Sequence, residues 1–322
     1  KEESIEPLYL SLIDDRLCKL DEFDFREIRK LGDGMDAIEN YMVSIVDKYG
    51  DNLEEIINEL FSELCQRINE TTIPYFISLL SYERVFNIYA IEKFMRYYNL
   101  PYEESDFILF TKLYPSLIER KQDEFYVYSC DLIKKVAKEF KEKHLPSLDE
   151  KVLVYLESLE RTSKFFIKSY PSKLVEAKDK ERIINTFIYL SKKFDENEKD
   201  LATYELYDSL LKSISSLVEE DYDFFISIFY ELIELSVTSI DFNSRISFSD
   251  IILFSSHGST YKKRKAHRRL IKDIARLLCQ KLDYLKNRKY CDFAWIICNS
   301  FILGDDAEAL ERCTDSVVEV TV

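Results

Sequence analysis

Apolar residues recur every three or four positions along most of this 322-residue chain. The stretch DNLEEIINELFSELCQRI (residues 51–68) shows the spacing typical of one face of an amphipathic helix. Its apolar positions are Leu53, Ile56, Ile57, Leu60, Phe61, Leu64, Cys65 and Ile68. The same pattern predicts helices at about 36–48, 83–98, 123–142, 149–169, 180–194, 203–217, 221–240 and 266–286. The sequence therefore predicts an all-α protein.

Residues that break helices are scarce. The chain has five glycines and six prolines, against the roughly 22 and 16 that average usage would supply. We expect helices to end at Gly32–Gly34, at Gly50 and at the prolines at 74, 101, 115, 146 and 171. Short links between such helices predict antiparallel helical hairpins. No repeat of fixed period is present, so the hairpins form either an irregular α-solenoid of the HEAT or armadillo kind or a two-lobed helical bundle.

The last proline, Pro171, lies in SYPSKLVEAKDKE (residues 169–181) and suggests where the chain divides. We expect an N-terminal helical half at 1–170, a C-terminal helical half at 171–313 and a tail at 314–322; the alternative is one continuous helical array. The tail carries the strand-like sequence SVVEVTV. The stretch at 221–237 is apolar on nearly every side, which predicts a helix buried all round.

Composition favours a folded intracellular protein, cytoplasmic or nuclear. Hydrophobic residues make up 46% of the chain and aromatic residues 14%, which excludes intrinsic disorder because such a chain can bury enough apolar surface to offset its entropy. The seven cysteines are odd in number and mostly far apart, unlike a disulfide framework. The longest apolar run, at 293–303, is too short to cross a bilayer, so no membrane span is expected.

No motif in the sequence predicts catalysis, a metal or a cofactor. Cys291 and Cys298 stand seven residues apart, which suits buried hydrophobic positions better than metal ligands. Adjacent acids such as Asp14 and Asp15 point about 100° apart on a helix. The sequence LGDGMD (residues 31–36) lacks the preceding strand and following lysine of a phosphate loop, so a glycine helix stop and an aspartate cap explain it better.

One stretch departs from the acidic character of the chain, which has 60 acidic and 45 basic residues. Residues 259–289 contain twelve lysines and arginines and two aspartates, for a net charge of +10, and leave −25 on the remainder. We call its predicted binding residues the basic ridge. They are Lys262, Lys263, Arg264, Lys265, Arg268, Arg269, Lys272 and Arg276. Charge segregation of this kind indicates a binding partner more than a fold.

Helical spacing predicts how this segment is arranged. At about 100° per residue, the apolar residues of 266–286 cover one side of the helix. Lys265, Arg268, Arg269, Lys272 and Arg276 cover the other. Lys263 and Arg264 would point to the apolar side, so they are expected to precede the helix.

Several partners would suit the basic ridge: nucleic acid phosphates, an import receptor, anionic lipid, or acids of the same chain. With Tyr261 the only aromatic residue beside the cations, phosphate contact is favoured over base stacking. The function predicted from the sequence is a non-enzymatic helical scaffold that binds a protein partner. The alternatives are a nucleic-acid-binding module that uses 259–289 and, less favoured, an enzyme with an unrecognised site.

Overall fold

The structure is a computed structural model that describes residues 7–49, 52–82, 85–121, 125–195 and 200–238 together with residue 273. The fold is all-α, as predicted, and its neighbouring helices pack as hairpins. The chain divides into two compact units between Tyr155 and Leu156. Unit 1 comprises the residues up to Tyr155, and unit 2 those from Leu156. The expected division at 170 and 171 stays a prediction, and the tail at 314–322 lies outside the described residues.

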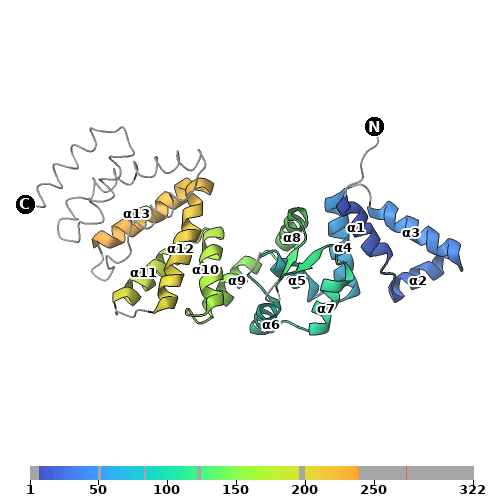
Figure 1. The fold of residues 1–322 in the computed structure, drawn as a ribbon, viewed down its shortest axis with the longest axis horizontal. Coiled ribbons are helices and arrows are strands. Elements are labelled where there is room, and N and C mark those ends of the chain that lie inside the picture. Colours follow the sequence, from blue (N-terminus) through green and yellow to red (C-terminus); the bar gives the residue numbers. More distant parts are fainter. Residues whose placement is uncertain are drawn as a thin grey trace, which may run out of the picture. The chain divides into compact units, whose positions relative to one another are not determined.

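Unit 1 contains nine described helices and a short β-hairpin (Figure 1). The helices are α1 (Pro7–Leu17), α2 (Glu22–Leu31), α3 (Met35–Tyr49), α4 (Leu53–Arg67), α5 (Ile73–Leu80), α6 (Ile88–Tyr97), α7 (Glu104–Leu113), α8 (Asp131–His144) and α9 (Leu148–Glu157), the last of which crosses the unit boundary. Helix α5 packs against α4, α7 and α8, and seven of its eight residues are buried. It is the centre of the apolar core of unit 1.

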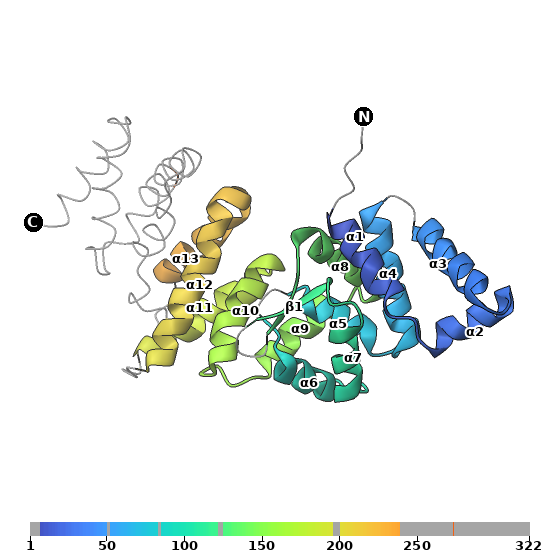
Figure 2. The same cartoon turned by 45° about the vertical axis from the view of Figure 1, so that its right-hand side comes forward.

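Helices α2 and α3 pack against each other as a hairpin, visible in both views of the ribbon (Figures 1 and 2). Asp21 and Asp24 form a capping box at the start of α2, in which each carboxylate accepts the backbone N–H of the other residue. Gly32 ends α2 with a φ of 136°, and Gly34 follows with a φ of 94°. Both values fall where a side chain would be strained, so these glycines allow the tight link between the helices.

The β-hairpin corrects one sequence-based prediction. Strand β1 (Ile118–Arg120) pairs antiparallel with β2 (Tyr126–Tyr128), with Ile118 opposite Tyr128. The helix predicted at 123–142 therefore begins only with α8 at Asp131. The sequence Tyr-Val-Tyr suits a half-buried strand better than a helix, and the Tyr128 hydroxyl secures it by donating to the Ile77 carbonyl at 2.6 Å.

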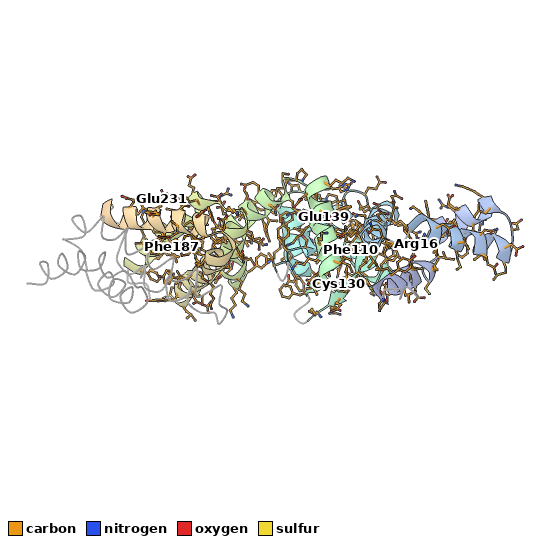
Figure 3. The ribbon with its side chains drawn as sticks, turned by 90° about the horizontal axis from the view of Figure 1, so that it is seen from above. Arg16, Phe110, Cys130, Glu139, Phe187 and Glu231 are labelled. Atoms are coloured by element: carbon orange, nitrogen blue, oxygen red, sulfur yellow. The ribbon has the colours of Figure 1, made fainter. Side chains whose placement is uncertain are left out.

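Unit 2 contains helices α10 (Lys164–Glu176), α11 (Lys180–Asp195), α12 (Leu201–Glu220) and α13 (Tyr222–Thr238) among its described residues. Helix α10 packs most extensively against α12, and α11 contacts each of the other three. Phe187 of α11 is fully buried and lies inside the unit (Figure 3). These helices match the predicted periodic stretches at 180–194, 203–217 and 221–240 closely.

Three details of unit 2 differ from the sequence-based predictions. The helix predicted at 149–169 is interrupted after Glu157, because Ser163 caps a new helix by accepting the Phe166 N–H at 3.3 Å. Pro171 lies inside α10 and does not end it; Pro171 itself is buried. Helix α13 is not buried all round, since Tyr230 is 41% exposed.

Candidate functional site

The predicted basic ridge lies outside the residues that the structure describes. Within the segment 259–289 only Asp273 is described, and it is helical and half-buried. Its carboxylate accepts a hydrogen bond from the hydroxyl of Tyr222, the first residue of α13, at 2.6 Å. The predicted helix at 266–286 thus contains one described residue with a contact to α13, while the eight binding residues stay a prediction.

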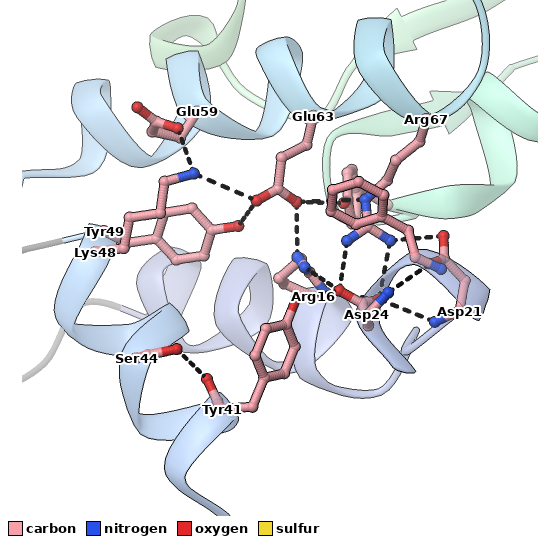
Figure 4. Close-up of polar contacts among 12 residues, drawn as sticks. Arg16, Asp21, Asp24, Tyr41, Ser44, Lys48, Tyr49, Glu59, Glu63 and Arg67 are labelled. Atoms are coloured by element: carbon pink, nitrogen blue, oxygen red, sulfur yellow. Dashed lines mark hydrogen bonds and ion pairs between the residues drawn. The ribbon is translucent and has the colours of Figure 1, made fainter. Parts of the chain in front are cut away.

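The most prominent polar feature of unit 1 is a buried ion cluster made of Arg16, Asp24, Glu63 and Arg67, which lie on α1, α2 and α4 (Figure 4). Arg16 is 2% exposed and Asp24 is fully buried. One Asp24 oxygen, Oδ1, lies 2.7 Å from Nη2 of Arg16 and also 2.7 Å from Nη2 of Arg67. Arg16 Nε forms an ion pair with Glu63 at 2.7 Å, at an angle that falls short of a hydrogen bond. Figure 3 shows Arg16 among these helices.

Three tyrosine hydroxyls complete the cluster. Tyr41 donates to Asp24 at 2.6 Å, while Tyr49 and Tyr114 donate to the two oxygens of Glu63 at 2.7 and 3.0 Å. Burial and the hydrogen bond to Asp24 raise the pKa of Tyr41 to about 12. Burial and the nearby Glu63 carboxylate raise the pKa of Tyr49 and Tyr114 still further. These hydroxyls therefore act as donors at neutral pH.

The charges of the ion cluster are balanced, which decides what it can do chemically. Burial alone would raise the pKa of Asp24, but hydrogen bonds from Arg67, Arg16 and Tyr41 hold it well below its usual range. Two guanidinium groups face two carboxylates, and both Asp24 oxygens accept several donors. A carboxylate bound in this way is a poor general base, because taking up a proton would break these contacts. The cluster is suited to joining helices.

Sequence reasoning missed this cluster. The local signal was the Asp-x-x-Asp spacing of the capping box at Asp21 and Asp24, which marks the start of α2. Arg67 lies 43 positions after Asp24, so no local pattern in the sequence connects the two charges. Only the packing of α4 beside α1 and α2 brings them together.

The described residues line two pockets of the size of a small-molecule site. One of about 300 Å³ lies at the start of α8 and is lined by Leu80, residues 127–131 and Lys134. Its half-buried Cys130 occupies the N-cap position of α8 without a side-chain capping bond. The other, of about 430 Å³, lies between α10 and α12 in unit 2, where Lys178 pairs with Asp221.

The described part also holds other side chains that could carry chemistry. Within it, no group of three or more histidine, cysteine or acidic side chains is placed to hold a metal ion. Cys18, Cys65 and Cys130 are free thiols, and burial together with the charge of Glu70 raises the pKa of Cys65 to about 12. In these same residues, no helix has the length and apolar character that crossing a membrane requires.

A surface feature distinguishes the α2–α3 hairpin. Helix α3 has one buried face, at Ala37, Tyr41, Ile45 and Tyr49. Next to this face runs a second apolar set, which we call the α3 stripe: Met35, Ile38, Met42, Val43 and Val46. Met35 is 68% exposed and Val43 is 58% exposed, while the other three are partly exposed. The α3 stripe is the best candidate for a functional surface among the described residues.

Comparisons with known proteins give no guide to the function: no protein-family model, no curated protein and no solved structure matches this chain.

Proposed function

We propose that the protein is a non-enzymatic, intracellular helical scaffold that binds a protein partner. The observation that carries this proposal is the α3 stripe, an apolar surface along an outer helix of a hairpin. Exposed apolar residues scattered singly are ordinary on a protein surface, whereas a contiguous set indicates an interaction site. The apolar residues of the stripe follow helical spacing over three turns, and the exposed Glu39 lies between Met35 and Val43 in the same row of the helix.

The polar groups of unit 1 support a scaffold over an enzyme. Its most deeply buried charges, Arg16 and Asp24, bind each other and their neighbours. Catalytic groups need a free position for substrate and a pKa near the working pH, and the ion cluster has neither. Its hydrogen bonds instead fix how the α2–α3 hairpin is held against α1 and α4, and a surface on that hairpin is thereby held in a defined orientation.

The scaffold proposal is tested by affinity purification of the full chain from cells that produce it. We expect a stoichiometric protein partner to be retained after nuclease treatment, because a protein interface does not depend on nucleic acid. A control variant of the basic ridge, with Lys265, Arg268, Arg269, Lys272 and Arg276 changed to glutamine, is expected to retain the same partner. Recovery of the chain without any stoichiometric protein would contradict the proposal.

A second candidate function, nucleic-acid binding, is favoured by the net charge of +10 on residues 259–289. Five phosphate contacts predict a log-log slope of affinity against salt of roughly −3.5 for single strands and −4.5 for duplex DNA. The same five glutamine substitutions should remove most of that slope. If the acids of the chain already neutralise the ridge, the wild-type protein will not bind nucleic acid at physiological salt, and the substitutions will change its thermal stability instead.

A further inference from the structure

The α3 stripe is exposed because α3 packs against the rest of unit 1 through the neighbouring face of the helix. Tyr41 and Tyr49 occupy the buried face of α3 and donate hydrogen bonds to Asp24 and Glu63. This junction combines those hydrogen bonds with the buried Ala37 and Ile45 and leaves the neighbouring apolar sector of the helix uncovered. Met35 and Val43 are then the two most exposed apolar side chains of α3, and covering them on binding would be favourable.

Acidic side chains lie beside the stripe on one side and, at Glu39, within it. Asp33 precedes α3, and Asp36, Glu39 and Asp47 lie on it; all four are exposed. Among the described residues none of them has an ion pair or a side-chain hydrogen bond. The lysine of α3, Lys48, is already paired with Glu59 at 2.8 Å. On α3 and at Asp33, the unpaired charge beside the stripe is therefore negative.

We propose that the α3 stripe binds a basic amphipathic helix of the partner protein, an inference that rests on the proposed scaffold function. The stripe extends over three turns, about 16 Å, and its residues are spaced as an apolar helix face requires for packing against a second helix. Met35 and Met42 have flexible, polarisable side chains that adapt to a partner surface. Lysines and arginines beside the apolar face of the partner helix would pair with the carboxylates around the stripe.

Charge also argues against two other occupants. A second copy of this chain would bring the carboxylates of one α3 against those of the other, in either direction of pairing, and like charges at an interface are unfavourable. An anionic membrane surface would be repelled by the same carboxylates. A cationic helix is the occupant whose charge and periodicity both fit.

The test uses two synthetic 18-residue helical peptides with the same leucine positions, one with lysines and one with glutamates at the flanking positions. Fluorescence anisotropy with the full chain is expected to show binding of the lysine peptide and at least tenfold weaker binding of the glutamate peptide. Val43→Glu places a charge in the stripe at an exposed position and should weaken binding of the lysine peptide at least tenfold. The double variant Asp36→Asn, Glu39→Gln should weaken it a few-fold and flatten its salt dependence.

The matched control is Leu109→Glu on α7, because Leu109 is 52% exposed in the same unit and the substitution adds the same charge. It should change the affinity less than twofold, and circular dichroism should show both variants folded. Equal loss of binding in the two glutamate variants would overturn the inference, since the loss would then not be specific to the α3 stripe. Absence of lysine-peptide binding would overturn it as well. Sedimentation that shows a wild-type dimer broken by Val43→Glu would also overturn it, by identifying a second copy as the occupant.

Failure of this inference is distinguishable from failure of the scaffold function. If Val43→Glu retains the stoichiometric partner in the affinity purification, the chain is a scaffold that uses another surface, and the inference is wrong. If the wild type captures no partner, the scaffold function itself is contradicted.

Discussion

Two junctions within unit 1 hold their helices by different physical means. Around α5 the contacts are aromatic. The centroid of the Phe76 ring lies 5.2 Å from the ring centroid of Phe107 and 5.8 Å from that of Phe110. Between α1, α2 and α4 the contacts are ionic, through Arg16, Asp24 and their partners. Apolar packing is non-directional, whereas the hydrogen bonds of an ion pair have fixed directions. The ionic junction therefore fixes the position of the α2–α3 hairpin while leaving apolar surface on α3 uncovered.

The largest expected effect tests the aromatic junction. Phe76→Ala removes a fully buried ring and should lower the free energy of unfolding by about 4 kcal/mol, through lost transfer energy and the cavity that remains. Since no charge changes, the loss should be the same at pH 7 and pH 4. The loss of unfolding free energy at each pH is measured by urea unfolding, with circular dichroism as the signal. A loss below about 1 kcal/mol would show that the surrounding rings collapse into the space.

A substitution in the ionic junction should lower the free energy of unfolding somewhat less at neutral pH than Phe76→Ala does, and this loss should depend on pH. Asp24→Asn leaves two buried guanidinium groups without their shared carboxylate and should cost about 3 kcal/mol at pH 7. The pKa of Asp24 is lowered in the folded protein, so its stabilising contribution is present above about pH 4, the usual aspartate pKa, and is lost as pH falls through the lower folded value. The difference between wild type and variant should therefore narrow below about pH 4.

Urea unfolding at pH 7, 5, 4 and 3 checks this dependence. The matched control is Arg26→Gln, which breaks the exposed pair between Arg26 and Glu22 on the same α2 helix and should leave unfolding unchanged, because exposed pairs contribute little. A difference between wild type and Asp24→Asn that stays constant down to pH 3 would show that Asp24 acts through packing and not through its charge.

The smallest effect concerns the tyrosines of the ion cluster. Tyr114→Phe removes one hydrogen bond to Glu63 while keeping the buried ring, and should cost about 1.5 kcal/mol, as for a neutral donor to a charged acceptor. Combined with Glu63→Gln in a double-mutant cycle, the two losses should not add, because both changes remove the same interaction. Additive losses would show that the contribution of Tyr114 does not depend on its hydrogen bond to Glu63.

Local sequence signals anticipated the helices more closely than their ends. The stretch 51–68 reads as a helix, and α4 buries Ile56, Ile57 and Leu60 as its periodicity predicts. The interruption after Glu157 and the strands at 118–128 were missed. Helix capping by a serine and pairing of two short strands each depend on one or two contacts. The spacing of apolar residues, averaged over a long stretch, does not predict such contacts. The prediction that a helix ends at Pro171 was wrong for a related reason. Pro171 lies inside α10, a helix whose other residues are extensively buried.

The sequence alone determined the helical class of this protein, because apolar residues at intervals of three and four can bury together only on a helix. It also located the segment of highest positive charge, since charge can be counted without a structure. Only the tertiary structure decided that Arg16, Asp24, Glu63 and Arg67 meet in one buried ion cluster, and that one apolar sector of α3 is buried while the next is exposed. A helix period shows which residues share a face, but burial depends on which other helices reach that face, and those helices are brought there by contacts between residues far apart in the sequence.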